Sequence, residues 1–581
     1  MARAIDLLAR DEDAKRHGEL VFVDYKALGV RQLGNIYEGL LMYHVVVPRD
    51  DWEKGFQREG LKVALVPSNK ERKSTGSYFT PQHIVKYIVS NTVGPLLKEK
   101  FEQIAPKLRQ AQREYAEMRE FEHKRAVKMR TTPRTDDAIA HSVMLKHEST
   151  VWDLFDLKVL DPAMGSGHFL VETVDFITDK VLDFLAGFPW NPVQVLIDQR
   201  IRRQIVESLD EQGVKINEDR LTDVNLIKRL VMKRCIYGVD LNPMAVELAK
   251  VSVWLDSFTL GAPPSFLDHH LKCGNLLIGT TIAELKKTVA ESGSLFAIPM
   301  EPLERATRNM ELIADLTDAT LTEVTKSADT CTKVLADVKG YRALLDCLTA
   351  QHFGQPQARD IVLHAESLGL KPGDWDRSFP KVHNTMRRII QDSLRVSEER
   401  RFFHWDIDFP DVFFTVRREP EQQAFDAVIG NPPWGADLDG QELHYVRTRF
   451  DWAGSQRDTY IEITQQAHRA LRHAGCYDMI LPDAWLTGKK YATFRRELLS
   501  TATPTSVVDL PYDTFEEAYV DCAVLTTMKR STESVRLSHK VEVHFCPVRS
   551  RIMTIVYGSS VFPIVRKVQK APVRQAFFRK W

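Results

Sequence analysis

The chain has 581 residues, of which 44% are hydrophobic and 27% charged, with 79 basic and 79 acidic residues. These values are ordinary for a folded globular protein, and they exclude a disordered, collagen-like or disulfide-scaffold chain. Charges interrupt the first twenty residues, and no stretch approaches the ~20 apolar residues that a bilayer span requires, so we expect neither a secretory signal nor a membrane anchor. Seven scattered cysteines without a CxxC spacing predict a cytoplasmic protein with no bound metal.

The net charge of zero hides an uneven distribution. Residues 535–581 carry ten Lys and Arg residues against one acid, Glu542. A cluster of this kind is typical of a surface that contacts phosphates, although an exposed basic tail remains an equal alternative. We therefore predict a basic C-terminal segment over residues 531–581.

The first predicted elements are helical. After a short apolar run at 20–23, residues 33–47 have apolar side chains at helical spacing. Thr80 and Pro81 precede another such run, which predicts a helix capped by Thr80 with Pro81 in its first turn. We expect residues 1–150 to form a mostly helical N-terminal region.

From residue 151 onward, short apolar strands alternate with helices, which indicates a mostly parallel α/β sheet. The predicted strands are 157–160, 235–240, 425–430, 475–482, 506–511 and 522–528. Residues 175–232 and 285–400 interrupt the alternation with helical periodicity, and we predict that both are helical insertions. The expected core therefore has one half at 151–284 and a second half at 401–530.

Two strand ends carry residues suited to a nucleotide-like ligand. The sequence DPAMGSGHFL (161–170) places Gly165 and Gly167 between a strand and a helix, where glycine allows a tight turn and a close backbone approach. In YGVDLNPMAVELAK (237–250), Asp240 ends a strand, where a carboxylate can accept both hydroxyls of a ribose. Taken singly, a turn without a ligand and a simple capping role remain open for these two motifs.

The third motif, FDAVIGNPPWG (425–435), is more specific. The prolines after Asn431 remove two N–H donors and leave carbonyl groups free to accept. The Asn431 side-chain oxygen and such a carbonyl form a pair of acceptors suited to an amino group, and Trp434 offers a flat face to a planar heterocycle. The alternative is a proline-rich turn with a packed tryptophan.

Together these motifs resemble the amino-group DNA methyltransferases that use S-adenosylmethionine, specifically the N6-adenine class. The resemblance is to the methyltransferase part of type IIG restriction–modification enzymes and related phage-defence methylases, and it extends from about Leu33 to Val524 outside the insertions. It is also carried by LGNIYEGLL, TGSYFTP, GNLLIG, FHWDIDFPDVFF, RDTYIEITQQAHRAL, ILPDAWLTG and YATFRRELL. It implies a Rossmann-like methyltransferase sheet with a helical N-terminal region and large helical insertions.

The resemblance also implies roles for individual residues. Those of the S-adenosylmethionine site would be Tyr78, Thr80 and Pro81 at the methionine end, Asp161, Ala163, Gly165 and Gly167 in the turn beneath it, Asp240 at the ribose, and Leu241 and Asn275 at the adenine. The catalytic motif would be Asn431, Pro432, Pro433 and Trp434. In this mechanism the Asn431 oxygen and the Pro432 carbonyl accept the two amino hydrogens of the target base, and the methyl group is transferred directly.

The implied partner is double-stranded DNA with a flipped adenine, against which Trp434 would stack. Relatives carry a nuclease and a target-recognition domain, whereas about 70 residues precede TGSYFTP here and about 50 follow the core. Sequence recognition is therefore expected from a separate specificity or defence-complex subunit or from the insertions, unless the reading frame is truncated. Two alternatives stay open: methylation of cytosine N4 or a protein glutamine, and a non-catalytic or partner-dependent subunit.

Overall fold

The computed structural model describes residues 80–214, 221–291, 298–454, 458–511, 514–515, 520–530 and 541–544, and the backbone of four short strands before residue 72. It divides into two compact units, residues 1–71 and 72–581. In the first unit, β1 (Arg10–Glu12) pairs antiparallel with β2 (Leu20–Phe22), and β3 (Tyr43–Val46) with β4 (Ala64–Pro67). The helical prediction is thus wrong for Tyr43–Val46, whose aromatic and β-branched residues favour extended backbone.

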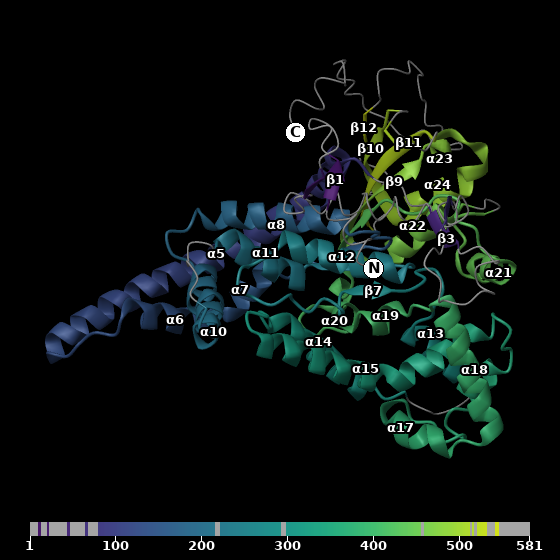
Figure 1. The fold of residues 1–581 in the computed structure, drawn as a ribbon, viewed down its shortest axis with the longest axis horizontal. Helices are drawn as coiled ribbons and strands as arrows, with labels where there is room; N and C mark the ends of the chain where they lie inside the picture. The colour runs from purple at the N-terminus through teal and green to yellow at the C-terminus, as the bar shows by residue number, and fades with distance from the viewer. Residues whose placement is uncertain are drawn as a thin grey trace. The chain divides into compact units, whose positions relative to one another are not determined.

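The second unit is built on one eight-stranded sheet with the order β12-β10-β11-β9-β8-β5-β6-β7 (Figure 1). Its strands are β5 (Val159–Asp161), β6 (Ile236–Asp240), β7 (Leu271–Cys273), β8 (Phe425–Gly430), β9 (Leu471–Pro482), β10 (Ala502–Asp509), β11 (Cys522–Lys529) and β12 (Glu542–His544). Neighbouring strands are parallel except β11, which is antiparallel to both β9 and β10. The expected α/β Rossmann-like sheet is confirmed, and β7 and β12 are the strands that the sequence did not predict.

The central strands are buried on both faces, as parallel strands covered by helices must be. All six residues of β8 are buried. On one face Met164 and Leu170 pack over Gly238, where a Cβ atom would lie 2.2 Å from the Met164 sulfur. The neighbouring Tyr237 and Val239 belong to an aromatic-rich cluster with Trp405, Phe409, Tyr460 and Phe494. Met164 is therefore a packing residue.

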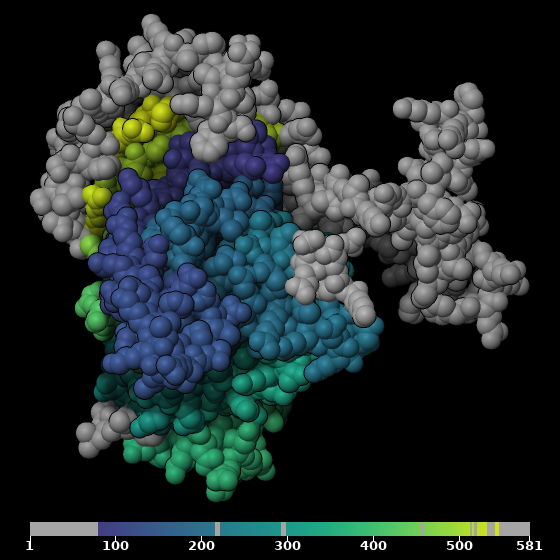
Figure 2. All heavy atoms as spheres, turned by 90° about the vertical axis from the view of Figure 1, so that its left-hand side faces the viewer, coloured from purple at the N-terminus to yellow at the C-terminus, as the bar shows by residue number. Residues whose placement is uncertain are grey.

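The long helix α5 (Gln82–Met129) begins at the sheet and continues well beyond it. It packs against β8, β9 and α8 (His168–Leu185), and then against α6 (Asp136–Lys146), with which it forms a helical arm (Figure 1). Figure 2 views the molecule from the end of this arm, where the blue surface faces the reader. The predicted Thr80 cap is wrong, because Pro81 occupies the N-cap position and no side chain caps the helix. The backbone N–H groups of Ile84 and Val85 donate to the Pro81 carbonyl instead.

Both predicted insertions are helical in the described part of the chain. The first contains the end of α8, α9 (Pro192–Leu196), a π-helix (Ile197–Arg202), α10 (Arg203–Glu211) and most of α11 (Asp223–Arg234). The second contains most of α13 (Ile282–Glu291), and all of α14 (Glu301–Asp315), α15 (Leu321–Ala350), α16 (Ala358–Leu363), α17 (Trp375–Ser378) and α18 (Asn384–Arg400). The helices of the second insertion bury their own apolar core, centred on Leu303, Tyr341 and Leu345. The boundaries of the proposed domains within residues 72–581 remain predictions.

Candidate functional site

The candidate site lies where three adjacent parallel strands end. Strand β5 lies between β6 and β8, so the last residues Asp161 and Asp240 and the residue after β8, Asn431, meet at one edge of the sheet. In open α/β sheets, ligands bind at the carboxyl ends of the strands where the strand order reverses direction. The chain passes from β5 to β6 on one side of β5, and β8 lies on the other side of β5. The carboxyl end of β5 is therefore a point where the strand order reverses.

The turn after β5 is fixed to the end of β6 by Asp240. Its Oδ2 accepts the Gly165 N–H at 2.9 Å, and its Oδ1 accepts the Asn242 N–H at 2.7 Å. Gly165 has a φ of +51° and open space where a Cβ would lie, whereas a Cβ on Gly167, at φ +84°, would lie 3.1 Å from that of Ala249. Both glycines are therefore required by the backbone, and the Gly165 side of the turn is accessible to a ligand.

Asp161 is a buried carboxyl with an unused oxygen. Its Oδ1 accepts the Ala163 N–H at 3.1 Å, while its Oδ2 is buried and makes no hydrogen bond. Burial is the main reason that the pKa of Asp161 is raised to about 8; the nearby Asp240 carboxylate contributes to the rise, and the hydrogen bond from Ala163 opposes it. Gly430 leaves the room for this side chain, because a Cβ there would lie 2.7 Å from Asp161 Oδ1. A cationic or hydrogen-donating ligand group beside Oδ2 would satisfy it.

Asn431 is joined to the segment before α5. Its Nδ2 donates a hydrogen bond of 3.3 Å to the hydroxyl of Thr80, a residue that is 4% exposed. The structure thus brings together two predicted site residues that are 351 positions apart. With the amide nitrogen directed at Thr80, the amide oxygen faces another direction, as a hydrogen-bond acceptor for an amino group must.

The rest of the Asn-Pro-Pro-Trp motif is held in place by neighbouring residues. Pro432 is buried, and Pro433 and Trp434 are half-buried. The Trp434 indole N–H donates to the Ile480 carbonyl at 3.2 Å, and its ring meets Phe515 edge-on with centroids 5.5 Å apart. The indole therefore has a fixed orientation, because its N–H edge is hydrogen-bonded to β9.

Leu241 and Asn275 lie at the ends of β6 and β7. Leu241 is 49% exposed, which leaves an apolar side chain available to a flat ligand. The Asn275 side-chain oxygen accepts the Leu277 N–H at 3.2 Å, so the amide is used in its own turn. Arg401, which the sequence did not single out, donates to the Leu241 carbonyl. Burial raises the pKa of Asp240, and the hydrogen bonds from Asn242 and Gly165 and the charge of Arg401 only partly oppose this rise.

Two further predicted residues lie at this edge, because Pro81 follows Thr80 and Ala163 lies two residues after Asp161. Tyr78 lies outside the described residues. Sequence reasoning assigned no role to Asp458 and Thr459, whose side chains accept from the backbone N–H groups of Gly435 and Ala436, the two residues after Trp434. Their sequence signal is ambiguous, because an Asp-Thr pair before an apolar-periodic run is typical of a helix cap. No group of His, Cys, Asp and Glu in the described part of the chain could hold a metal ion.

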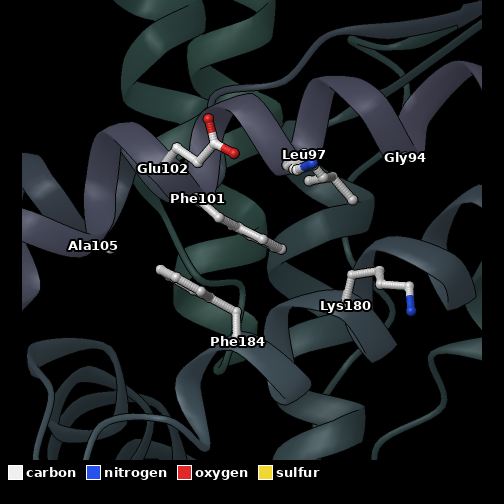
Figure 3. Close-up of a pocket in the computed structure, with 8 residues that line it drawn as sticks. Gly94, Leu97, Phe101, Glu102, Ala105, Lys180 and Phe184 are labelled. Atoms are coloured by element: carbon white, nitrogen blue, oxygen red, sulfur yellow. The ribbon is translucent and has the colours of Figure 1, made fainter.

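A groove of about 340 Å³ lies elsewhere, between α5 and α8 (Figure 3). Phe101 and Phe184 stack across it with ring centroids 4.3 Å apart, and Lys180 and Glu102 lie at its border. It contains none of the predicted site residues. None of the described helices combines the length and hydrophobicity that crossing a membrane would take.

Comparisons with known proteins agree with the motif resemblance. Residues 234–515 match the family model of the Eco57I restriction-modification methylase. A Methanocaldococcus jannaschii protein assigned as a type II restriction enzyme and methyltransferase is 23% identical over 547 residues, covering 89% of this chain and 41% of its own. The chain thus spans less than half the length of this relative.

Solved structures of restriction–modification proteins are similar to the chain at a lower level. The type IIL enzyme MmeI in complex with DNA is 12% identical with a TM-score of 0.34, and the match covers 80% of this chain and 39% of MmeI. The type I methyltransferase subunit from Streptococcus thermophilus is 13% identical with a TM-score of 0.19, covering 68% and 85%. At these scores, the fold assignment rests on the strand order and register described above.

Proposed function

We propose that this chain, whose residues 234–515 match the family model of the Eco57I restriction-modification methylase, transfers a methyl group from S-adenosylmethionine to the N6 amino group of adenine in DNA. The observation that carries the proposal is the hydrogen bond from Asn431 Nδ2 to Thr80. This hydrogen bond directs the amide oxygen of the Asn-Pro-Pro-Trp motif away from Thr80. The motif lies at the carboxyl ends of the strands, where Asp161 and Asp240 are the last residues of β5 and β6.

The residues at this edge fit S-adenosylmethionine. Asp161 offers a buried oxygen without a hydrogen-bond partner, which suits a cationic group, and the turn at Gly165 adjoins open space. Asp240 holds the turn and retains lone pairs for the ribose hydroxyls. The other residues proposed to line the cofactor are Tyr78, Thr80, Pro81, Ala163, Gly167, Leu241 and Asn275. When bound, the cofactor supplies an activated methyl group.

The chain itself has to orient the acceptor. The amino nitrogen of adenine is a poor nucleophile because its lone pair is delocalised into the ring. Asn431 Oδ1 and the Pro432 carbonyl would accept its two hydrogens and shift the nitrogen toward tetrahedral geometry, with the lone pair aimed at the methyl group. Pro433 restricts the backbone, and Trp434 supplies an aromatic surface for the flipped base.

The DNA partner and the biological setting belong to the same proposal. The target base must leave the duplex to reach the strand edge, so the substrate is double-stranded DNA with an extruded adenine. The proposal includes a restriction–modification or phage-defence role, which the family match supports. A separate subunit that selects the sequence is part of the proposal and is drawn from the sequence alone. A cytoplasmic location remains an expectation from the sequence.

The test uses the purified chain with methyl-labelled S-adenosylmethionine and a mixture of DNA substrates, followed by hydrolysis and identification of the labelled base. Label in N6-methyladenine is the expected result. Label in N4-methylcytosine or in protein would replace the proposal with one of the alternatives. No label with the cofactor still bound would favour a non-catalytic or partner-dependent subunit. In the same assay Asn431→Ala should give no labelled base, and Asn91→Ala, an exposed substitution on α5, is its matched control.

A further inference from the structure

The backbone turn that follows the two prolines is held in an unusual way. The turn comprises Pro433 to Ala436, and Gly435 in it has a φ of +64°. In a common β-turn, the fourth N–H donates directly to the first carbonyl. Here the Ala436 N–H donates to the Thr459 hydroxyl at 3.1 Å, and that hydroxyl donates to the Pro433 carbonyl at 3.2 Å. One side chain thus replaces the hydrogen bond of the turn.

The residue before Thr459 bonds the same turn. Asp458 Oδ1 accepts the Gly435 N–H at 3.2 Å. Asp458 occupies the N-cap position of α22 (Thr459–Ala470), yet its side chain makes no capping bond to that helix. Because an aspartate at this position ordinarily satisfies helix N–H groups, its use on the turn is a departure from the local rule. Burial of the Asp458 carboxyl raises its pKa to about 6, against the stabilising Gly435 hydrogen bond.

The two side chains therefore bond the end of the motif that, under the proposed function, faces the base. Trp434 lies inside the turn, and its indole is fixed separately to Ile480. The Pro432 carbonyl directly precedes the turn, so rotation of the backbone at the first residue of the turn would redirect it. On the cofactor side the hydrogen bonds are made by different carboxyl groups, those of Asp161 and Asp240, which accept from the backbone after β5 and β6.

We propose that Asp458 and Thr459 are positioning residues that set the orientation of Trp434 and the Pro432 carbonyl toward the target base. This role rests on the proposed methyltransferase function, and it is separate from cofactor binding. Thr459 is suited to it because a hydroxyl both accepts from Ala436 and donates to Pro433, which neither a valine nor an alanine can do.

The test compares Thr459→Val, which keeps the shape and removes the hydroxyl, with Thr459→Ser, which keeps the hydroxyl. Initial rates of methyl incorporation into unmethylated DNA are measured at saturating S-adenosylmethionine, and cofactor affinity is measured separately by calorimetry. We expect Thr459→Val to lower the rate roughly 10- to 100-fold, since misplacement of reacting groups by about 1 Å has this effect. Thr459→Ser should retain most of the rate, and cofactor affinity should stay within about twofold in both.

Thr464→Val is the matched control. Thr464 is a buried threonine of the same helix whose hydroxyl donates to the Tyr460 carbonyl at 2.7 Å and lies away from the turn. It should change stability and leave the rate per folded molecule unchanged. If Thr459→Val fails to fold, Asp458→Ala against Asp458→Asn supplies the second pair, because asparagine keeps an acceptor for Gly435.

The outcomes separate this role from the proposed function. A wild-type chain that binds the cofactor and methylates no DNA overturns both. A wild-type chain that methylates DNA, with Thr459→Val at the same rate, overturns the positioning role alone. Equal losses in the valine and serine variants, or a loss of cofactor affinity that matches the loss of rate, also overturn it.

Discussion

Replacing Asp161 by asparagine should make the stability of the protein less sensitive to pH. The folded structure holds this carboxyl at a pKa of about 8 because it is buried, against an ordinary value of 3.8. At pH 7 the folded protein keeps this group protonated, although pH 7 lies about 3 units above the ordinary pKa at which the unfolded chain loses the proton. Compared with low pH, this lowers the free energy of unfolding by about 4 kcal/mol. Asparagine keeps the oxygen that accepts from Ala163 and cannot ionise.

The sign follows from the raised pKa. The folded state binds the proton more tightly than the unfolded chain, so the stability that Asp161 contributes is fully present below about pH 4 and is lost as the pH rises toward 8. The unfolding free energy of Asp161→Asn minus that of the wild type should rise by about 1.4 kcal/mol per pH unit between pH 5 and 7. Fixed costs of the substitution, such as about 1–3 kcal/mol for an unsatisfied amide group, shift this difference without changing its slope.

The assay is urea unfolding of both proteins at pH 5, 6 and 7 at constant ionic strength, followed by tryptophan fluorescence and circular dichroism. Glu172 and Glu462, whose burial raises their pKa values to about 7, are present in both proteins and cancel in the difference. A difference that stays constant over this range would refute the protonated state of Asp161. Calorimetry in two buffers extends the test, because a cationic ligand beside Oδ2 should release close to one proton at pH 7 from the wild type and none from the variant.

Four further changes test the site. Asn431→Ala should abolish methylation with cofactor affinity nearly intact by calorimetry, and loss of that affinity would count against its catalytic assignment. Thr80→Val should lower methylation about 10-fold or more while Thr80→Ser keeps it, because only the serine preserves the bond to Asn431; equal rates in the two variants would remove this hydrogen bond from the mechanism. Asp240→Ala frees the Gly165 N–H and should weaken cofactor binding at least 10-fold by calorimetry, and unchanged binding would exclude Asp240 from the cofactor site. A chain ending at His544 should show a lower slope of DNA affinity against salt, by roughly one for each phosphate that residues 545–581 neutralise; an unchanged slope would place the phosphate-binding surface elsewhere.

The strands of the central sheet could be predicted because their composition is unambiguous. Residues 425–430 are apolar apart from one acid and end at two prolines, and β8 occupies the same residues. Residues 236–240 end at an acid and the helix start Asn242-Pro243, and β6 ends there too. Buried parallel strands of this kind carry the strongest local signal.

The errors arose where a distant contact decides the local structure. Thr80 has the sequence signature of a cap, but its hydroxyl accepts from Asn431, which lies 351 positions away. Asp458 likewise occupies a cap position and bonds Gly435, 23 positions earlier. The strand β7 has three residues, and its pairing with β6 is not visible in so short a stretch. Local propensity is a weak guide when tertiary hydrogen bonds compete with it.

Under the proposed function, two consecutive residues join the cofactor side of the site to the side that holds the base. Gly430 and Asn431 are consecutive, and the first abuts Asp161 in the cofactor turn while the second bonds Thr80 before α5. Because these two residues share one planar peptide, a shift of Asp161 that displaces Gly430 would also move Asn431 wherever the flanking φ and ψ angles do not compensate. The 433–436 turn is fixed independently, by α22 and β9. The motif is thus held from the cofactor side at its start and from the opposite side at its end, so the Pro432 carbonyl between them is constrained by both.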